Sequence, residues 1–195
     1  MKIFPICLLA LLVVAFTVSG NAESKMSLSV GGDVLIPMGD FGDAASTGFG
    51  GSVRFQYDVS PMASIGLTSG YYIWSGKDFG GVTGPDIKGI PIRAFGKYYF
   101  MPMEERKPRV YGIVEVGVFI SSVDVPSYTI LGVTYGGGTE SNTDFNWAPG
   151  VGVEIPLGSG RTLLDVSARY DAISATGGTN GSIGGRVGVN FMLGN

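Results

Sequence analysis

The residues of this sequence best suited to chemistry are charged side chains that alternate with apolar ones along the chain. Acids and bases spaced in this way can form a buried network of ion pairs, a path for protons or ions, or a general acid–base pair. The candidate residues are Arg54, Arg93, Lys97, Glu115, Glu154, Asp165, Arg169 and Arg186.

Enzymatic chemistry is disfavoured because the 195 residues contain no histidine and a single cysteine, Cys7. Histidine is the commonest general base, and without it a serine or threonine nucleophile needs a lysine or another activating base. Lys97 could be such a base, but its neighbours Phe95 and Tyr99 indicate a packed environment. We therefore expect no enzymatic activity, no cofactor and no bound metal.

The composition is that of neither a typical soluble domain nor a nucleic-acid-binding protein. Charged residues make up 15% of the chain and the formal net charge is −3, whereas an ordinary soluble domain has about 25% charged residues. The 33 glycines argue against a helix-rich fold. The length suits one domain, and we expect no nucleic-acid partner.

Residues 1–22 have the pattern of a secretory signal peptide. Met1-Lys2 gives a positive start, an apolar run covers 3–18, and the small residues Gly20 and Ala22 fit a signal-peptidase site. A transmembrane anchor is the alternative, but the run is shorter than the ~20 residues that a helix needs to cross a bilayer. We expect cleavage after Ala22, export, and one β-barrel domain over 23–195.

The rest of the chain alternates between apolar and polar residues with a period of two, which predicts strands with two different faces. In the clearest stretch, Val53 and Phe55 alternate with Ser52, Arg54 and Gln56. Each stretch is close to the ~9–11 residues of a tilted strand that crosses a bilayer, and bacterial barrels have an even number of strands. The predicted strands are 26–36, 49–59, 63–73, 90–100, 110–120, 145–155, 164–171 and 183–193.

Short and long connections also alternate. Tight turns are predicted at 60–61 and 157–161 and a connection of intermediate length at 101–108. Long polar loops are predicted at 37–46, 75–86, 121–143 and 173–182. This is the pattern of an outer-membrane barrel with both termini on the periplasmic side. The predicted fold is therefore all-β: an eight-stranded antiparallel up-and-down transmembrane β-barrel with short periplasmic turns and long extracellular loops.

A soluble, lipocalin-like periplasmic barrel would show the same alternation with its apolar face inward. The polar face here is mostly glycine and serine with few charges, which suits a narrow lumen better than a surface in water. The apolar face carries aromatic residues near both strand ends, as expected at two membrane interfaces. One group is Phe49, Tyr71, Phe145, Trp147 and Tyr170, and the other is Tyr57, Tyr98, Phe100 and Phe191.

With the apolar face outward, the charged residues point into the lumen, among them also Asp33, Asp58 and Asp171. Unpaired charges are costly there, so we expect a structural network of ion pairs. A conducting path for protons or ions is the alternative. Counting back from the 101–108 turn places Arg93 and Glu115 within about one residue of register, as a paired couple. We expect no inward apolar stripe beyond Phe95, Tyr99 and Phe119.

Three segments carry a resemblance to a known family: Gly48-Phe49-Gly50-Gly51, the run 147–154 (WAPGVGVE), and the last strand. The chain resembles the small eight-stranded outer-membrane barrels, the OmpA-transmembrane, OmpX and OmpW-like group. The resemblance implies an assembly signal in Arg186, Gly188, Phe191 and Leu193, although Gly194-Asn195 follow where the family commonly ends in an aromatic residue.

The same resemblance implies an outer-membrane location in a diderm, Gram-negative-type bacterium. It implies lipids, lipopolysaccharide and the barrel-assembly machinery as partners. The function we expect is a non-enzymatic one in envelope integrity or surface interaction. The alternative is an OmpW-like channel or transporter for small hydrophobic molecules.

The segment 121–143 is unusually apolar for a loop, with Val123, Val125, Ile130 and Leu131 among its residues. Two interpretations remain open. The flanking strands extend beyond the membrane and pack together, or the segment forms an exposed patch for an extracellular partner.

Overall fold

The computed structural model describes residues 26–79, 82–102, 107–130, 133–158, 161–175 and 178–193. The predicted signal peptide, its cleavage site after Ala22 and the terminal Gly194-Asn195 lie outside the described residues. In the described part of the chain, no helix is long and apolar enough to cross a membrane.

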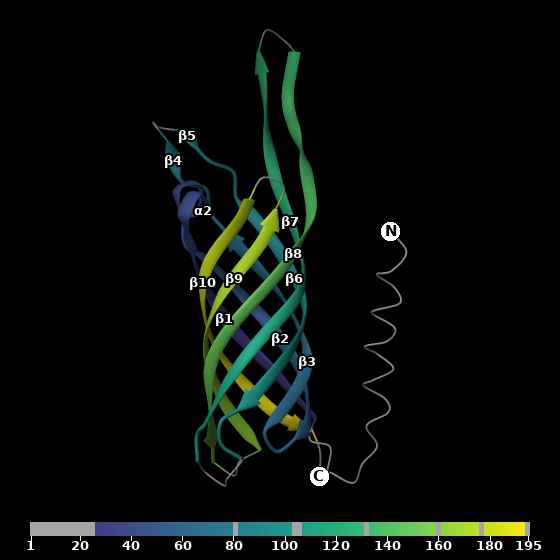
Figure 1. Cartoon of the computed structure of the whole chain (residues 1–195). Helices are drawn as coiled ribbons and strands as arrows, with labels where there is room; N and C mark the ends of the chain where they lie inside the picture. The colour runs from purple at the N-terminus through teal and green to yellow at the C-terminus, as the bar shows by residue number, and fades with distance from the viewer. Residues whose placement is uncertain are drawn as a thin grey trace.

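Eight long antiparallel strands close into a barrel in the order β1-β10-β9-β8-β7-β6-β3-β2 (Figure 1). Apart from the seam between β1 and β10, neighbours in the barrel follow each other along the sequence, which is the predicted up-and-down topology. The strands are β1 (Met26–Met38), β2 (Gly48–Ser60), β3 (Ala63–Trp74), β6 (Ile87–Tyr99), β7 (Arg109–Ile130), β8 (Val133–Leu157), β9 (Thr162–Ala175) and β10 (Gly178–Leu193).

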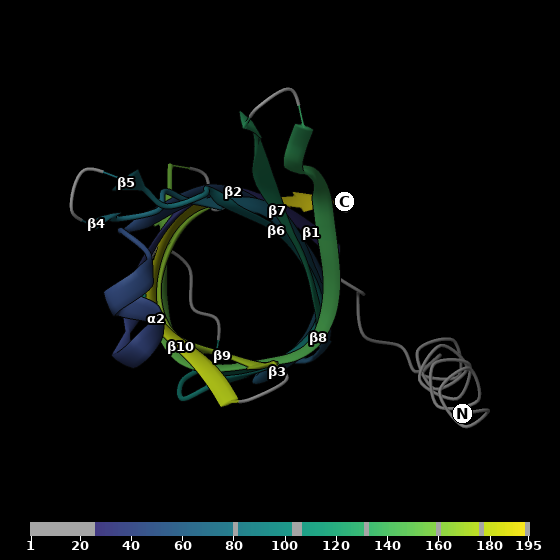
Figure 2. The ribbon, with the colours of Figure 1, turned by 90° about the horizontal axis from the view of Figure 1, so that it is seen from above.

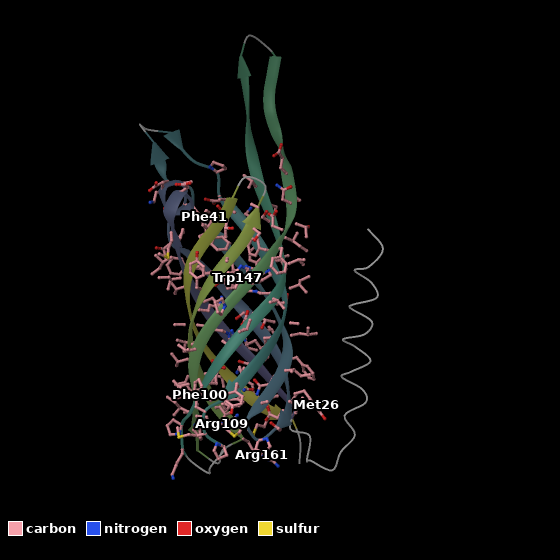
Figure 3. All side chains as sticks on the ribbon, viewed as in Figure 1. Met26, Phe41, Phe100, Arg109, Trp147 and Arg161 are labelled. Atoms are coloured by element: carbon pink, nitrogen blue, oxygen red, sulfur yellow. The ribbon has the colours of Figure 1, made fainter. Side chains whose placement is uncertain are left out.

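Pairing of the first strand with the last closes the barrel. The register runs from Met26 opposite Leu193 to Met38 opposite Gly181. Within the barrel wall, closure gives every strand a partner on both sides, which a lipid environment requires because it offers no water to satisfy backbone groups. Met26 and Arg161 lie at the same end of the barrel, the end of the short turns, whereas Phe41 lies at the loop end (Figure 3).

The period-two pattern becomes two distinct barrel faces. On β2, Phe49, Val53 and Phe55 are exposed on the outside, while Ser52 and Arg54 are buried in the lumen. The apolar face therefore looks outward, as predicted, and the polar face fills the interior.

Glycines on the strands make room for rings inside this narrow barrel. A Cβ atom at Gly89 would lie 2.0 Å from the ring of Phe119, and one at Gly48 would lie 2.5 Å from the indole of Trp74. Only glycine permits such close approach of a ring to the backbone. The high glycine content thus serves interior packing.

The connections differ from the sequence predictions mainly at the loop end. The predicted loop 173–182 is largely strand, because β9 extends to Ala175 and β10 begins at Gly178. The predicted loop 37–46 contains the short helix α2 (Gly39–Ala44), and 75–86 contains a small hairpin of β4 (Asp78–Phe79) and β5 (Val82–Thr83). These segments are rich in small polar residues, but their backbones pair as strands where the neighbouring strand also continues.

The segment 121–143 is a strand extension. β7 and β8 remain paired from Val123 opposite Glu140 to Ile130 opposite Val133. The resulting hairpin rises beyond the rest of the barrel (Figure 1). This confirms the paired strand extension that the first of the two interpretations expects.

Candidate functional site: the charged lumen

The lumen holds a band of buried charged side chains contributed by seven strands. All eight sequence-predicted charged residues are in it, and Asp33 and Asp171, also predicted to point inward, join them. Asp58, a further inward prediction, is only half-buried. The buried set is Asp33, Arg54, Arg93, Lys97, Arg109, Glu115, Glu154, Asp165, Arg169, Asp171 and Arg186.

Arg109 belongs to this band although it was not predicted from the sequence to be one of its members. Its signal was present, because it alternates with the outward-facing Val110, but it lies at the first position of β7 beside a turn. There it faces Glu154 directly across the β7–β8 pair, with Nη2 2.7 Å from Oε2.

Glu115 is the centre of the middle part of the band. Its Oε1 accepts a hydrogen bond from Arg54 Nη2 at 2.6 Å, and its Oε2 lies 3.1 Å from Arg93 Nη1. Arg93 Nη1 also donates to Asp171 Oδ1 on β9 at 2.6 Å. The contacts between β2 and β7, and between β6 and β9, join strands that are not neighbours in the sheet.

The predicted couple of Arg93 and Glu115 is brought together, but not in the predicted register. Arg93 is opposite Gly117 and Glu115 is opposite Phe95, so the two are two positions apart rather than within one. The paired residues of β6 and β7, such as Tyr99 opposite Tyr111, are centred on position 105. An even count over 101–108 instead puts the centre half a residue earlier. Long side chains reach such a diagonal partner.

A second group lies nearer the short turns, around Lys97. The Lys97 ammonium is 2.8 Å from Glu154 Oε1 and 3.2 Å from Asp165 Oδ2. It also lies 4.3 Å from the ring centroid of Tyr111, whose hydroxyl donates to Asp165 Oδ1 at 2.8 Å. Lys97 is thus fully engaged as an ammonium between two acids, an arrangement unsuited to a general base.

A third group follows the β1–β10 seam. Arg169 Nη1 is 2.9 Å from Asp33 Oδ1, and Ser52 Oγ donates to the other oxygen of Asp33 at 2.5 Å. Arg186 donates to the hydroxyls of Ser52 and Ser29 at 2.8 and 2.9 Å. Its guanidinium has a weaker acidic partner, Asp165, at 3.8 Å.

Two glycines enclose the Arg186 guanidinium. A Cβ atom at Gly31 would lie 2.8 Å from Cζ of Arg186, and one at Gly188 would lie 2.6 Å from Nη1. Of the other residues in the predicted assembly signal, Phe191 and Leu193 are exposed on the outer face of β10. The four residues therefore divide between the lumen and the lipid-facing surface.

Above the charged band, the loop end of the lumen is closed by an apolar cluster. Trp74 is at its centre, with ring centroids 5.9 Å from each of Phe41, Tyr72 and Phe119. The expectation of no inward apolar stripe beyond Phe95, Tyr99 and Phe119 was wrong. Tyr72 and Trp74 share the inward parity of Thr68 on β3, and the buried cluster is Leu35, Ala45, Tyr72, Trp74, Phe119 and Ile173.

The outer surface carries aromatic side chains at two levels. Trp147 lies toward the loop end and Phe100 toward the short turns (Figure 3). Trp147 is in edge contact with Tyr170, and Phe100 with Tyr98, at centroid distances of 6.5 and 6.1 Å. All four rings are exposed, as expected for side chains at the two lipid interfaces.

Among the described residues, the lumen offers buried ion pairs. In the residues that the structure describes, no group of three or more acidic, histidine or cysteine side chains is placed to hold a metal ion. The charges are paired with one another across the lumen, and removing one of them leaves its buried partners uncompensated.

Comparison with known proteins agrees with this architecture. The family model described as outer membrane protein beta-barrel domain matches residues 7–191. The chain belongs to this family. Membership points to the outer membrane of a Gram-negative bacterium. A search of curated proteins finds no match to the sequence.

Several solved outer-membrane barrels share the fold. Neisserial surface protein A has a TM-score of 0.63 at 16% identity, covering 86% of this chain and 97% of its own. OprG from Pseudomonas aeruginosa gives 0.58 at 13%, with 90% and 99% covered. Ail of Yersinia pestis, solved with the heparin analogue sucrose octasulfate, gives 0.56 at 12%, with 88% and 100% covered. At these identities the likeness shows the fold alone.

Proposed function

We propose that the protein is a non-enzymatic outer-membrane barrel that serves envelope integrity or surface interaction rather than solute passage. The observation that carries the proposal is the set of ion pairs that cross the lumen. Arg54 on β2 reaches Glu115 on β7, and Arg93 on β6 reaches Asp171 on β9. An eight-stranded barrel has an interior just wide enough for side chains to fill, and these pairs span it.

The hairpin of β7 and β8 supports the surface role. It extends past the other loops, and its backbone pairing holds it as a ribbon rather than a mobile loop (Figure 1). We propose 121–143 as the contact site for an extracellular partner, with lipids and lipopolysaccharide surrounding the barrel below it.

Export and assembly complete the proposal. Residues 1–22 would direct the chain to the secretory pathway and be removed. The last strand, with Arg186, Gly188, Phe191 and Leu193, would be read by the barrel-assembly machinery. The exposed side chains of Phe191 and Leu193 at the end of β10 support this role, because a receptor can reach them.

A hairpin deletion separates the two roles. Cells expressing the full chain are compared with cells expressing a variant in which 124–139 is replaced by a two-residue turn, with no expression as the control. We expect both proteins to keep a hydrophobic fluorescent dye out of the envelope, and only the full chain to support adhesion. If expression changes neither dye entry nor adhesion, the proposal is wrong.

The second candidate function is an OmpW-like transporter for small hydrophobic molecules. The apolar cluster around Trp74 favours it, because an apolar site inside the loop end could accept such a molecule. Uptake of a labelled hydrocarbon into proteoliposomes tests it. Uptake faster than in protein-free liposomes, abolished by a bulky substitution in the cluster such as Ala45→Phe, would favour transport over the lead proposal.

A further inference from the structure

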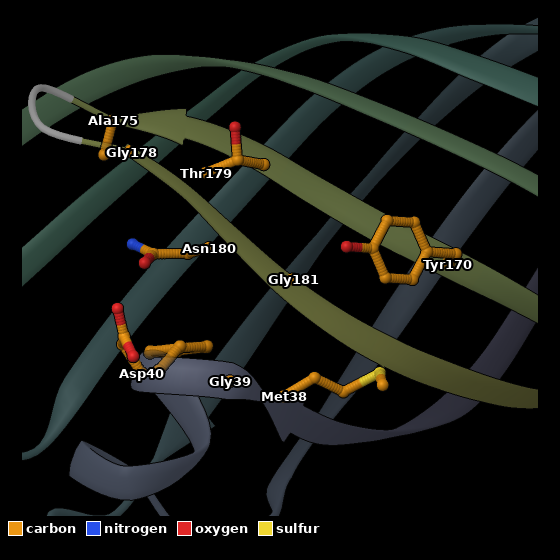
Figure 4. A pocket seen from close by; sticks show the side chains of 10 residues that line it. Met38, Gly39, Asp40, Tyr170, Ala175, Gly178, Thr179, Asn180 and Gly181 are labelled. Atoms are coloured by element: carbon orange, nitrogen blue, oxygen red, sulfur yellow. The ribbon is translucent and has the colours of Figure 1, made fainter.

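A pocket of about 530 Å³ lies at the loop end between α2 and the β9–β10 hairpin (Figure 4). α2 projects outward from the barrel wall next to β10 (Figure 2). The pocket is on the outer surface, because its lining includes the exposed, outward-facing side chains of Met38 and Tyr170. Its volume is in the range of small-molecule sites.

The lining of the pocket changes from apolar to polar along the barrel axis. Met38 and Tyr170 belong to the exposed apolar surface, and Tyr170 contacts Trp147 at the level of the aromatic side chains. Asp40, Thr179 and Asn180 form the part nearer the loop tips, just after the end of β1 and at the start of β10. With the loop end in the outer leaflet, as the proposed location implies, the pocket would span the boundary between lipid chains and head groups.

Tyr170 reaches into this pocket across β10. A Cβ atom at Gly181 would lie 2.4 Å from its hydroxyl oxygen. A side chain at this position would therefore collide with Tyr170, and glycine leaves that space free. Figure 4 shows the hydroxyl of Tyr170 directed toward Gly181 and the carboxylate of Asp40 directed toward Asn180. A hydroxyl, a carboxylate and an amide thus surround one space.

The charge of the lining residues indicates which kind of head group the pocket can bind. Asp40 is the one charged side chain among the described lining residues, and no lysine or arginine accompanies it. A phosphate or sulfate would be repelled. Carboxylate and amide groups together offer acceptors and donors that match neighbouring hydroxyls.

An apolar track continues from the pocket toward the membrane centre. On the outer face of β9 and β10, Ile183, Val187 and Val166 are exposed. Ile183 is paired with Tyr170, and Val187 with Val166. An alkyl chain attached to a head group in the pocket would lie on these side chains.

We propose that this pocket binds the uncharged, hydroxyl-rich head group of a membrane amphipath whose alkyl chain lies along β9 and β10. The inference rests on the proposed outer-membrane location, with the loop end in the outer leaflet interface.

The test uses n-octyl glucoside, titrated into phosphatidylcholine bicelles that hold the isotope-labelled protein. We expect the amide resonances of Gly39, Thr179 and Gly181 to shift saturably, at least about three-fold more than that of Gly96 on the opposite wall. Octyl phosphate and octylammonium, with the same chain, should produce no such local shift, and neither should free glucose.

Two variants complete the experiment. Thr179→Trp fills the pocket and should abolish the local shifts, whereas Ile92→Trp adds the same ring to the lipid-facing surface of β6 and should leave them intact. Equal shifts at both walls, which indicate simple partitioning, would overturn the inference. So would octylammonium or glucose acting as well as the glucoside. Failure of the protein to enter bicelles would instead contradict the proposed location.

Discussion

Arg93 and Glu115 form an ion pair although they do not face each other in the sheet. Arg93 Nη1 lies 3.1 Å from Glu115 Oε2, while the register places Arg93 opposite Gly117. Each also has a closer partner on a distant strand, since Arg93 reaches Asp171 and Glu115 reaches Arg54, both at 2.6 Å. Glu115 is therefore shared between two arginines, which makes it the residue on which the middle of the network depends.

Loss of Glu115 alone should be strongly destabilising. Among the described residues, Glu115→Leu leaves Arg54 with Asp165, 3.9 Å away, as its acidic partner. An uncompensated buried charge costs roughly 3–5 kcal/mol. Adding Arg54→Met should recover most of the loss, and adding Arg93→Met should recover less, because that change also strips a partner from Asp171. Urea unfolding in detergent is measured for the native protein, the three single variants Glu115→Leu, Arg54→Met and Arg93→Met, and the two double variants. Additive losses in the double variants would show that the residues do not interact.

Two glycines on β6 provide a matched test of interior packing. Gly89→Ala places a methyl group against the ring of Phe119, whereas at Gly96 a Cβ atom meets nothing within 4 Å. We expect Gly89→Ala to lower the free energy of unfolding by about 1–3 kcal/mol and Gly96→Ala to change it little. Phe119→Leu should partly rescue Gly89→Ala. Equal effects at the two glycines would contradict a ring packed on the strand backbone.

The two tryptophans should respond differently to truncation. Trp74 is buried among the rings of Phe41, Tyr72 and Phe119, so Trp74→Ala should cost about 3–5 kcal/mol through the cavity it leaves. Trp147 is on the outer surface, and Trp147→Ala should cost clearly less in the same unfolding measurement. A larger loss at Trp147 would argue against a closed apolar cluster at the loop end.

Strand positions and the direction of each face could be predicted from the sequence, because period-two alternation is a local property that burial imposes directly. Alternation predicts that the adjacent residues Ser52 and Val53 point to opposite faces, and the structure places Ser52 in the lumen and Val53 on the outer surface. Membrane crossing could also be predicted, from the aromatic residues at both ends of the outward face.

Contacts across the lumen could not be predicted in this way. They depend on register and on which strands face each other in the closed barrel, as the two-residue offset of Arg93 and Glu115 and the distant partner Asp171 show. The inward cluster at Trp74, the extension of β9 to Ala175 and the start of β10 at Gly178 depend on how far the barrel wall continues at the loop end. Alternation alone does not fix that length.

The predicted signal peptide has a direct chemical consequence. If residues 1–22 are removed on export, the mature protein begins at Glu23 and contains no cysteine, since Cys7 lies in the removed segment. Intact-mass and N-terminal peptide measurements on protein from the outer-membrane fraction check this. Retention of Met1, or recovery in the soluble periplasm, would refute the prediction.

The packed, charge-matched lumen is tested most directly by single-channel recording of the purified protein in planar bilayers. The ion pairs that cross the barrel predict no stable conductance steps for the native chain. A variant in which Arg54, Arg93 and Glu115 are all serine, folded as judged by heat-modifiable migration, should conduct because its lumen has been emptied. Large, reproducible conductance from the native protein would contradict the packed lumen and favour a channel.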